Sequence, residues 1–250
     1  MKINIGIIGC GVIGGALKRW ISEYNPDCNL LISDPPKGFN DDISIADIFF
    51  ISIHIPTEND NTQNLSLLKK IIKGLPDKPI FIRTTLIPGT TDLLKKEFAK
   101  NVIFMPEFLR ERTAYEDFCS QPMIFCGEIE LLKKIFIGKK YEAMTSLEAE
   151  ITKYAHNVFG AIKVTYFNGV HELASRYNCN YEKIRKGVLL SGNISEMHTM
   201  VPGHDGKFGY GGKCFPKDVE AFKKFTEGTR LGDMINLAGT HNEYYRKKNE

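Results

Sequence analysis

The sequence predicts an α/β fold in which a doubly wound parallel sheet is followed by an all-helical part. Over residues 1–145, short and nearly continuous apolar runs alternate with segments of helical periodicity. This alternation is typical of parallel strands covered by helices on both faces. From residue 146 onward the apolar residues recur at helical spacing, without strand-like runs. We therefore expect two domains, residues 1–145 and 146–250.

The expected strands of the first domain are short runs rich in Ile, Leu and Phe. Glycine, proline or acidic residues bound them, and these are the usual turn formers. Strands are expected at 3–8, 30–32, 48–53, 80–83 and 102–104. The helices between them are expected at 12–24, 65–72 and 91–99.

One long helix dominates the expected second domain. Residues 147–177 contain no proline and carry apolar residues at helical spacing over a wide face. Further helices are expected at 181–190, after the N-cap residue Asn180, and over 217–227 and 232–247. A wide apolar face is hard to cover in so small a domain, so contact with a second copy of the chain is expected.

Composition and charge argue against several classes of protein. The 250 residues are 42% hydrophobic and 25% charged, with a net charge of +3, which indicates neither a nucleic-acid nor a membrane partner. No run of about 18 apolar residues is present, and the N-terminal apolar run is too short for a signal peptide. The six cysteines form no CxxC pair and no Cys/His cluster with ligand spacing. This pattern favours reduced thiols in the cytoplasm and argues against a metal site.

A glycine-rich turn of the GxGxxG type follows the first expected strand. Here it opens a helix, and Asp34 stands 20 residues after Gly14, at the end of the second strand. Glycines allow close backbone approach, the helix N-terminus attracts phosphates, and the carboxylate binds ribose hydroxyls. Because that charge repels a 2′-phosphate, this Rossmann-like pattern predicts NAD rather than NADP; the alternative is a turn that only packs helix on sheet. The expected cofactor contacts are Gly9, Gly11, Val12, Ile13, Gly14, Asp34 and Lys37.

A second glycine-rich turn leads to a cysteine. Three glycines approach Cys214, and Pro216 is expected as the first residue of the next helix. A thiol that precedes a helix N-terminus, with Lys213 and Lys217 beside it, is expected to have a lowered pKa and to be nucleophilic. The alternative is a buried structural cysteine.

Five segments together resemble the UDP-glucose/GDP-mannose 6-dehydrogenase family. They are the N-terminal glycine turn, RTTLIPGTT at 83–91, MPEFLRE at 105–111, AEITKYAHN at 149–157 and GYGGKCFPKD at 209–218. Their order and separation are similar to those in the family's first two domains. The resemblance implies an NAD-binding domain, a helical dimerisation domain and a homodimer formed through 147–177. It also implies that NAD oxidises a nucleotide sugar, with UDP-glucose expected, at C6 through an aldehyde to the carboxylate.

The resemblance assigns the central chemistry to three residues. Cys214 matches the nucleophile that attacks the aldehyde, giving a thiohemiacetal that is oxidised to a thioester. Lys153 and Asn157 match the family's oxyanion-stabilising pair. Their spacing agrees, because residues i and i+4 of a helix point the same way and two donors can then meet one oxygen. The alternative is a solvated helix face.

Further roles follow from the same resemblance. Asp218 matches the residue that orients water or acts as a base, and Glu107 matches the general base of thioester hydrolysis, although it could simply cap a helix. Thr85 matches a residue that holds the catalytic water, and both Thr85 and Glu111 are expected near the cofactor. Substrate contacts are expected from Glu107, Phe108, Leu109, Arg110, Lys153, Asn157, Gly209, Tyr210, Gly211 and Gly212.

The sequence also departs from the family. Only 32 residues follow Asp218, so the family's third domain, which closes over the substrate nucleotide, is expected to be absent. Arg83 stands where the family tends to have Lys, and residues 121–127 lack a usual arginine. Two alternatives stay open. One is a protein that binds NAD or a nucleotide sugar and needs a partner domain for turnover. The other is a single-step β-hydroxyacid-type dehydrogenase, which needs no cysteine nucleophile.

Overall fold

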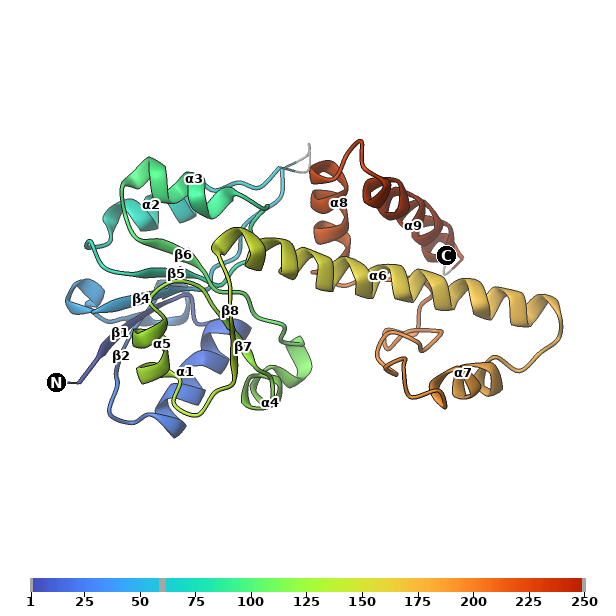
Figure 1. Cartoon of the computed structure of the whole chain (residues 1–250), viewed down its shortest axis with the longest axis horizontal. Helices are drawn as coiled ribbons and strands as arrows, with labels where there is room; N and C mark the ends of the chain where they lie inside the picture. Colours follow the sequence, from blue (N-terminus) through green and yellow to red (C-terminus); the bar gives the residue numbers. More distant parts are fainter. Residues whose placement is uncertain (1, 59–61, 249–250) are drawn as a thin grey trace. The chain divides into compact units, whose positions relative to one another are not determined.

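The computed structural model of the chain describes residues 2–58 and 62–248. These residues form two compact units, Met1–Lys153 and Tyr154–Glu250, and the division falls within helix α6 (Ser146–Arg176). The first unit is α/β and the second is helical (Figure 1), which confirms the predicted fold class. No helix in the described part of the chain is long and apolar enough to cross a membrane.

A six-stranded sheet in the order β3-β2-β1-β4-β5-β6 forms the centre of the first unit. Its neighbouring strands are parallel, except that β3 is antiparallel to β2. The strand order reverses between β1 and β4, and ligands of doubly wound sheets bind beyond the carboxyl ends of the strands at such a point. The strands are β1 (Asn4–Ile8), β2 (Asn29–Asp34), β3 (Phe39–Asn40), β4 (Ile48–Ile51), β5 (Ile80–Ile82) and β6 (Val102–Phe104).

Helices cover both faces of this sheet (Figure 1). One face carries α1 (Val12–Tyr24), α4 (Ala114–Ser120) and α5 (Ile129–Ile135), and the other carries α2 (Ser66–Gly74) and α3 (Thr90–Phe98). Strands β4 and β5 are buried at every position, which explains why they read as continuous apolar runs.

The sequence does not predict the shortest elements of the first unit. β7 (Met123–Phe125) and β8 (Tyr141–Ala143) form a separate two-stranded parallel sheet, and β8 is exposed at all three positions. The strands β3 and β8 lack the continuous apolar run that marks the similarly short β5 and β6, and the seven-residue helices α4 and α5 span only about two turns. The remaining short elements are 3₁₀ turns at Pro35–Lys37, Ile43–Ile45 and Glu111–Thr113.

The second unit contains most of α6 together with α7 (Tyr181–Leu189), α8 (Phe215–Phe225) and α9 (Arg230–Lys247). The side chain of Asn180 caps α7 as predicted, because its Oδ1 accepts a hydrogen bond from the backbone N–H of Lys183 at 3.0 Å. Helix α8 begins at Phe215, so the prediction of Pro216 as its first residue is wrong by one position. Either position suits proline, because no N–H of the first helical turn has an intrahelical acceptor.

Candidate active site

Close packing explains the glycines that follow β1. Gly9 has a φ of +86°, and a Cβ there would lie 2.5 Å from the carbonyl oxygen of Ser52, beyond β4. A Cβ on Gly14 would lie 2.0 Å from the carbonyl oxygen of Gly9. Only glycine fits either position, so the first turn of α1 lies directly against the end of β1.

The N-terminus of α1 suits a dinucleotide. Its N-cap residue, Gly11, offers no side-chain cap, so the first N–H groups of the helix remain for a ligand. One carboxylate oxygen of Asp34 accepts a hydrogen bond from the N–H of Cys10 at 2.7 Å, which leaves the other for ribose hydroxyls. Lys37 Nζ donates to the carbonyl oxygen of Cys10 at 2.9 Å and lies 3.9 Å from Asp34. Asp34 and Lys37 therefore lie beside the glycine turn as predicted, and Val12 is 43% exposed there.

A buried ion pair joins the segment after β6 to α6. Lys153 Nζ lies 3.0 Å from Oε1 of Glu107 and also donates to the backbone carbonyl of Glu107. The N–H of Leu109 donates to the other carboxylate oxygen at 2.7 Å, and the ring of Phe108 lies 5.3 Å from Lys153 Nζ. Lys153 is 5% exposed, so the alternative of a solvated helix face is wrong for this residue.

Two residues that the sequence does not single out hold the segment after β5. Gln63 donates from Nε2 to the carbonyl oxygen of Thr85 at 2.9 Å and accepts the N–H of Ile87 at 3.0 Å. The fully buried Glu150 accepts hydrogen bonds from the N–H of Gly89 at 2.7 Å and from the N–H of Thr91 at 2.9 Å. Glu150 thereby caps α3 and fixes the start of α6. It lies three residues before Lys153 on the same helix, but nothing in the sequence distinguishes it from other helical acids.

Arg110 is held by an acidic residue of α4. Its Nε and Nη2 donate to the two carboxylate oxygens of Asp117 at 3.0 and 2.5 Å, and its backbone N–H donates to Asp117 at 2.9 Å. This fork fixes the segment that leads to Glu111, which is exposed in the 3₁₀ turn. The predicted substrate contact at Arg110 can use only those guanidinium donors that Asp117 leaves.

The Arg110–Asp117 pair predicts a loss of stability in acid. The hydrogen bond from Arg110 lowers the pKa of Asp117 from its usual 3.8 to about 2. Because the folded-state pKa of Asp117 is lowered, the ion pair stabilises the protein above pH 4. This stabilisation is lost as the pH falls from about 4 to 2. Asp117→Asn should therefore cost about 2 kcal/mol at pH 7 and reduce the acid dependence of the free energy of unfolding, measured by urea titration. Glu130→Gln, in an exposed pair, should change stability by less than about 1 kcal/mol; equal effects would contradict the assignment.

A second polar cluster links α6 to α8. Asn157 Nδ2 donates to Oδ2 of Asp218 at 2.6 Å, and Lys217 Nζ lies 2.5 Å from the other oxygen. Oδ1 of Asn157 lies 2.9 Å from Nδ1 of His156, an exposed neighbour that fixes the amide orientation when this nitrogen is protonated. Asn157 is 7% exposed and Asp218 is 1% exposed, so neither belongs to a solvated face.

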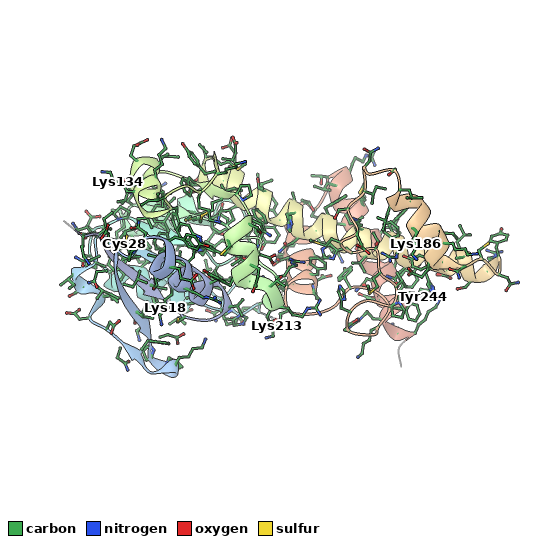
Figure 2. The ribbon with its side chains drawn as sticks, turned by 90° about the horizontal axis from the view of Figure 1, so that it is seen from below. Lys18, Cys28, Lys134, Lys186, Lys213 and Tyr244 are labelled. Atoms are coloured by element: carbon green, nitrogen blue, oxygen red, sulfur yellow. The ribbon has the colours of Figure 1, made fainter. Side chains whose placement is uncertain are left out.

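Cys214 is the exposed N-cap residue of α8. Its carbonyl accepts the N–H of Asp218 at 3.0 Å, which sets the distance along the helix between thiol and carboxylate. Lys213 precedes it in the exposed loop (Figure 2). The alternative of a buried structural cysteine is wrong.

Polar side chains of α6 and α9 hold the glycine-rich loop that leads to Cys214. Asn168 accepts the N–H of Gly209 at 3.0 Å, and Asn242 accepts the N–H of Tyr210 at 2.6 Å while donating to the carbonyl of Tyr210 at 3.1 Å. A Cβ on Gly211 would lie 2.5 Å from the guanidinium of Arg246. The sequence gives no hint of these contacts, because they join segments more than 30 residues apart.

Each of these two clusters, taken by itself, offers an N–H donor that can stabilise a negative charge on oxygen. Lys153 and Asn157 are four residues apart on α6, and each retains one N–H that no described protein group accepts. Preorganised donors of this kind favour an alkoxide or a tetrahedral oxyanion. Among the described residues, no group of three or more His, Cys, Asp or Glu side chains could hold a metal ion.

Two sequence profiles of the UDP-glucose/GDP-mannose dehydrogenase family match the chain. The NAD binding domain of the family matches residues 36–145, and its central domain matches residues 147–244. The UDP-glucose 6-dehydrogenase of Rickettsia felis is 29% identical over 231 residues, which cover 84% of this chain and 50% of that protein. The enzyme of the same name from Campylobacter jejuni is 32% identical over 189 residues, which cover 68% of this chain and 47% of that protein. The chain thus spans about half the length of the curated relatives it matches.

Solved structures share the fold at low sequence identity. A UDP-glucose dehydrogenase from Pyrobaculum islandicum superposes with a TM-score of 0.78 at 22% identity, over 98% of this chain and 68% of that one. The 3-hydroxyisobutyrate dehydrogenase of Mycobacterium tuberculosis superposes with a TM-score of 0.68 at 12% identity, over 98% and 96% of the two chains. The fold therefore recurs in dehydrogenases with different names.

Proposed function

The chain belongs to the UDP-glucose/GDP-mannose dehydrogenase family, and on this premise we propose that it oxidises UDP-glucose at C6 to the carboxylate with two NAD per sugar. Membership confirms the resemblance drawn from the sequence motifs. The observation that carries the proposal is the buried donor pair of Lys153 and Asn157, together with the exposed thiol of Cys214. The names of the matched relatives favour UDP-glucose as the sugar nucleotide.

The cofactor belongs to the first unit. The match to the family's NAD binding domain confirms the prediction of NAD. The N–H groups at the start of α1 would bind its phosphates, and Asp34 would bind its adenosine ribose. When bound, NAD supplies the hydride acceptor for both oxidation steps.

The first oxidation needs a base for the C6 hydroxyl proton and donors for the developing alkoxide. Lys153 and Asn157 supply the donors through the N–H groups that Glu107 and Asp218 leave unused. Asp218 accepts the proton directly or through a water molecule. Loss of one proton and one hydride from the C6 alcohol gives the aldehyde.

The second oxidation passes through a covalent bond to Cys214. The thiolate adds to the aldehyde carbon, and the oxygen is protonated to give a thiohemiacetal. Loss of a second hydride and of the hydroxyl proton gives a thioester. Water, positioned by Thr85 and deprotonated by Glu107, then hydrolyses the thioester to the carboxylate and frees the thiol.

The same proposal includes a homodimer formed through helix 147–177. Apolar side chains of α6 and α9, including Tyr166, Leu173, Met234 and Leu237, line an apolar groove of about 510 Å³ in the second unit. Each of these four side chains is more than half exposed, which favours their burial against a second copy. Sedimentation equilibrium should give twice the chain mass, and Leu237→Asp should shift the protein to monomer. A wild-type monomer at all concentrations would contradict the dimer.

We also place the protein in the cytoplasm. None of the six cysteines, all of which lie in the described residues, forms a disulfide, and the proposed chemistry needs a reduced thiol at Cys214. Recovery of the protein from an oxidising compartment during cell fractionation would contradict this location.

NADH formation by the purified chain tests the proposed function. With UDP-glucose and NAD, absorbance should rise in proportion to enzyme concentration, and NADP should be a poor substitute because Asp34 repels its 2′-phosphate. Tight NAD binding without NADH formation, for UDP-glucose and other nucleotide sugars alike, would instead favour a binding protein that needs a partner domain.

A further inference from the structure

Arg83 is a buried cation that the proposed chemistry does not use. It follows β5, and only 2% of the residue is exposed. Its Nε and Nη1 atoms have no hydrogen-bond partner within the described residues, and its guanidinium lies 5.2 Å from the ring centroid of Phe118. Burial lowers the pKa of Arg83 to about 10, so the group stays protonated at neutral pH. A buried charge with two unpaired donor nitrogens is costly unless another group binds it.

Neighbouring carboxylates do not neutralise this charge. Glu107 is the acid whose charge acts on Arg83, but its two oxygens already accept from Lys153 at 3.0 Å and from the N–H of Leu109 at 2.7 Å. No carboxylate forms an ion pair with Arg83 in the described part of the chain. A further cation, Lys139, lies 5.2 Å from the same Phe118 ring. Lys139 is half-buried and donates to backbone carbonyls, so it adds positive charge near Arg83 without removing the unpaired charge of Arg83 itself.

Arg83 is one of the residues that line a small cavity. Glu107, Phe108, Phe118 and Gln121 are also among the residues that line it, and its volume is about 20 Å³. Space of this size is enough for one particle about as large as a water molecule. Gln121 donates only weakly to the carbonyl of Phe108, at 3.4 Å, so its amide is a second donor beside the cavity.

We propose that this cavity binds one small monovalent anion, chloride, through Nε and Nη1 of Arg83. A water molecule would satisfy the N–H groups but would leave the buried charge uncompensated. A halide would accept from the N–H groups and also compensate the charge. Chloride and bromide are compact monatomic anions, and the much larger gluconate serves as the reference anion in the test below. This inference does not depend on the proposed function.

Thermal unfolding of the full chain tests the site. In this titration, sodium gluconate is exchanged for sodium chloride at constant ionic strength, so that the screening of charges by salt does not change. The midpoint temperature of the wild type should rise along a saturating curve, by about 4 °C when chloride reaches about ten times its dissociation constant. Arg83→Met should abolish the rise. Arg230→Met, which removes a fully exposed arginine, should keep it.

A second measurement covers the case in which Arg83→Met does not fold. Wild-type crystals soaked in sodium bromide should show an anomalous scattering peak within hydrogen-bond distance of Nε and Nη1. A water molecule alone in the cavity would overturn the proposal. So would a chloride response that is absent in the wild type or that persists in Arg83→Met.

Discussion

Replacing Cys214 by Ser should lower the rate of uronate formation from UDP-glucose by about 10⁴-fold or more. The first oxidation needs only the alcohol, the base and the oxyanion donors, whereas the second needs a thiolate to hold the aldehyde. A serine hydroxyl is far less acidic than a thiol, so much less of the nucleophilic anion is available at neutral pH. The variant should therefore stop at the aldehyde, and a carbonyl trap such as hydroxylamine should capture this product for mass spectrometry.

Cys179→Ser is the matched control for this substitution. Cys179 is also exposed, and it lies before α7, outside the candidate active site. It should retain the wild-type rate of uronate formation. A single-step β-hydroxyacid-type dehydrogenase needs no thiol nucleophile, so full activity of Cys214→Ser would favour that alternative and overturn the covalent step.

Lys153→Met should have the largest effect on stability while also removing a catalytic donor. The Lys153 ammonium and the Glu107 carboxylate are 7% and 8% exposed, so the substitution leaves a buried carboxylate with one backbone N–H as its remaining hydrogen-bond partner. Breaking a buried pair costs about 3–5 kcal/mol, or about 10 °C in the midpoint temperature of a chain of this length. Loss of one oxyanion donor should also lower kcat by 10² to 10³-fold.

The double variant Lys153→Met/Glu107→Gln separates the two effects. Removing both charges avoids the unpaired carboxylate, so most of the lost stability should return, measured by thermal unfolding. Activity should not return, because both the oxyanion donor and the base for hydrolysis are missing. A single variant as stable as the wild type would contradict the assignment of a buried ion pair.

The sequence predicts the elements that have a clear period. The alternation of apolar runs and the glycine turn after β1 are enough to predict the sheet. The absence of proline over 147–177 is enough to predict α6. The strands β3 and β8 were not predicted because they lack the continuous apolar run that marks the equally short β5 and β6. Their presence depends on pairing with distant strands rather than on local preference.

The candidate site was predictable where its residues fall in motifs, as Cys214 and Lys153 do. Residues that act through long-range contacts were not predictable. In the sequence, Glu150 is indistinguishable from other acidic residues on a helix. Its role depends on the fold, which places it against the backbone N–H groups of Gly89 and Thr91. In the sequence, Arg83 looks like a conservative replacement of Lys. Its burial against Phe118 could not be foreseen, because it depends on α4, which the sequence does not predict.

The most direct test of the central claim is the number of NADH molecules formed per UDP-glucose consumed. The purified 250-residue chain, with NAD in excess, should be followed to completion while sugar and NADH are counted in the same sample. The proposed thioester route predicts two NADH per sugar and a carboxylate product. One NADH per sugar, with an aldehyde or ketone as the final product, would contradict it.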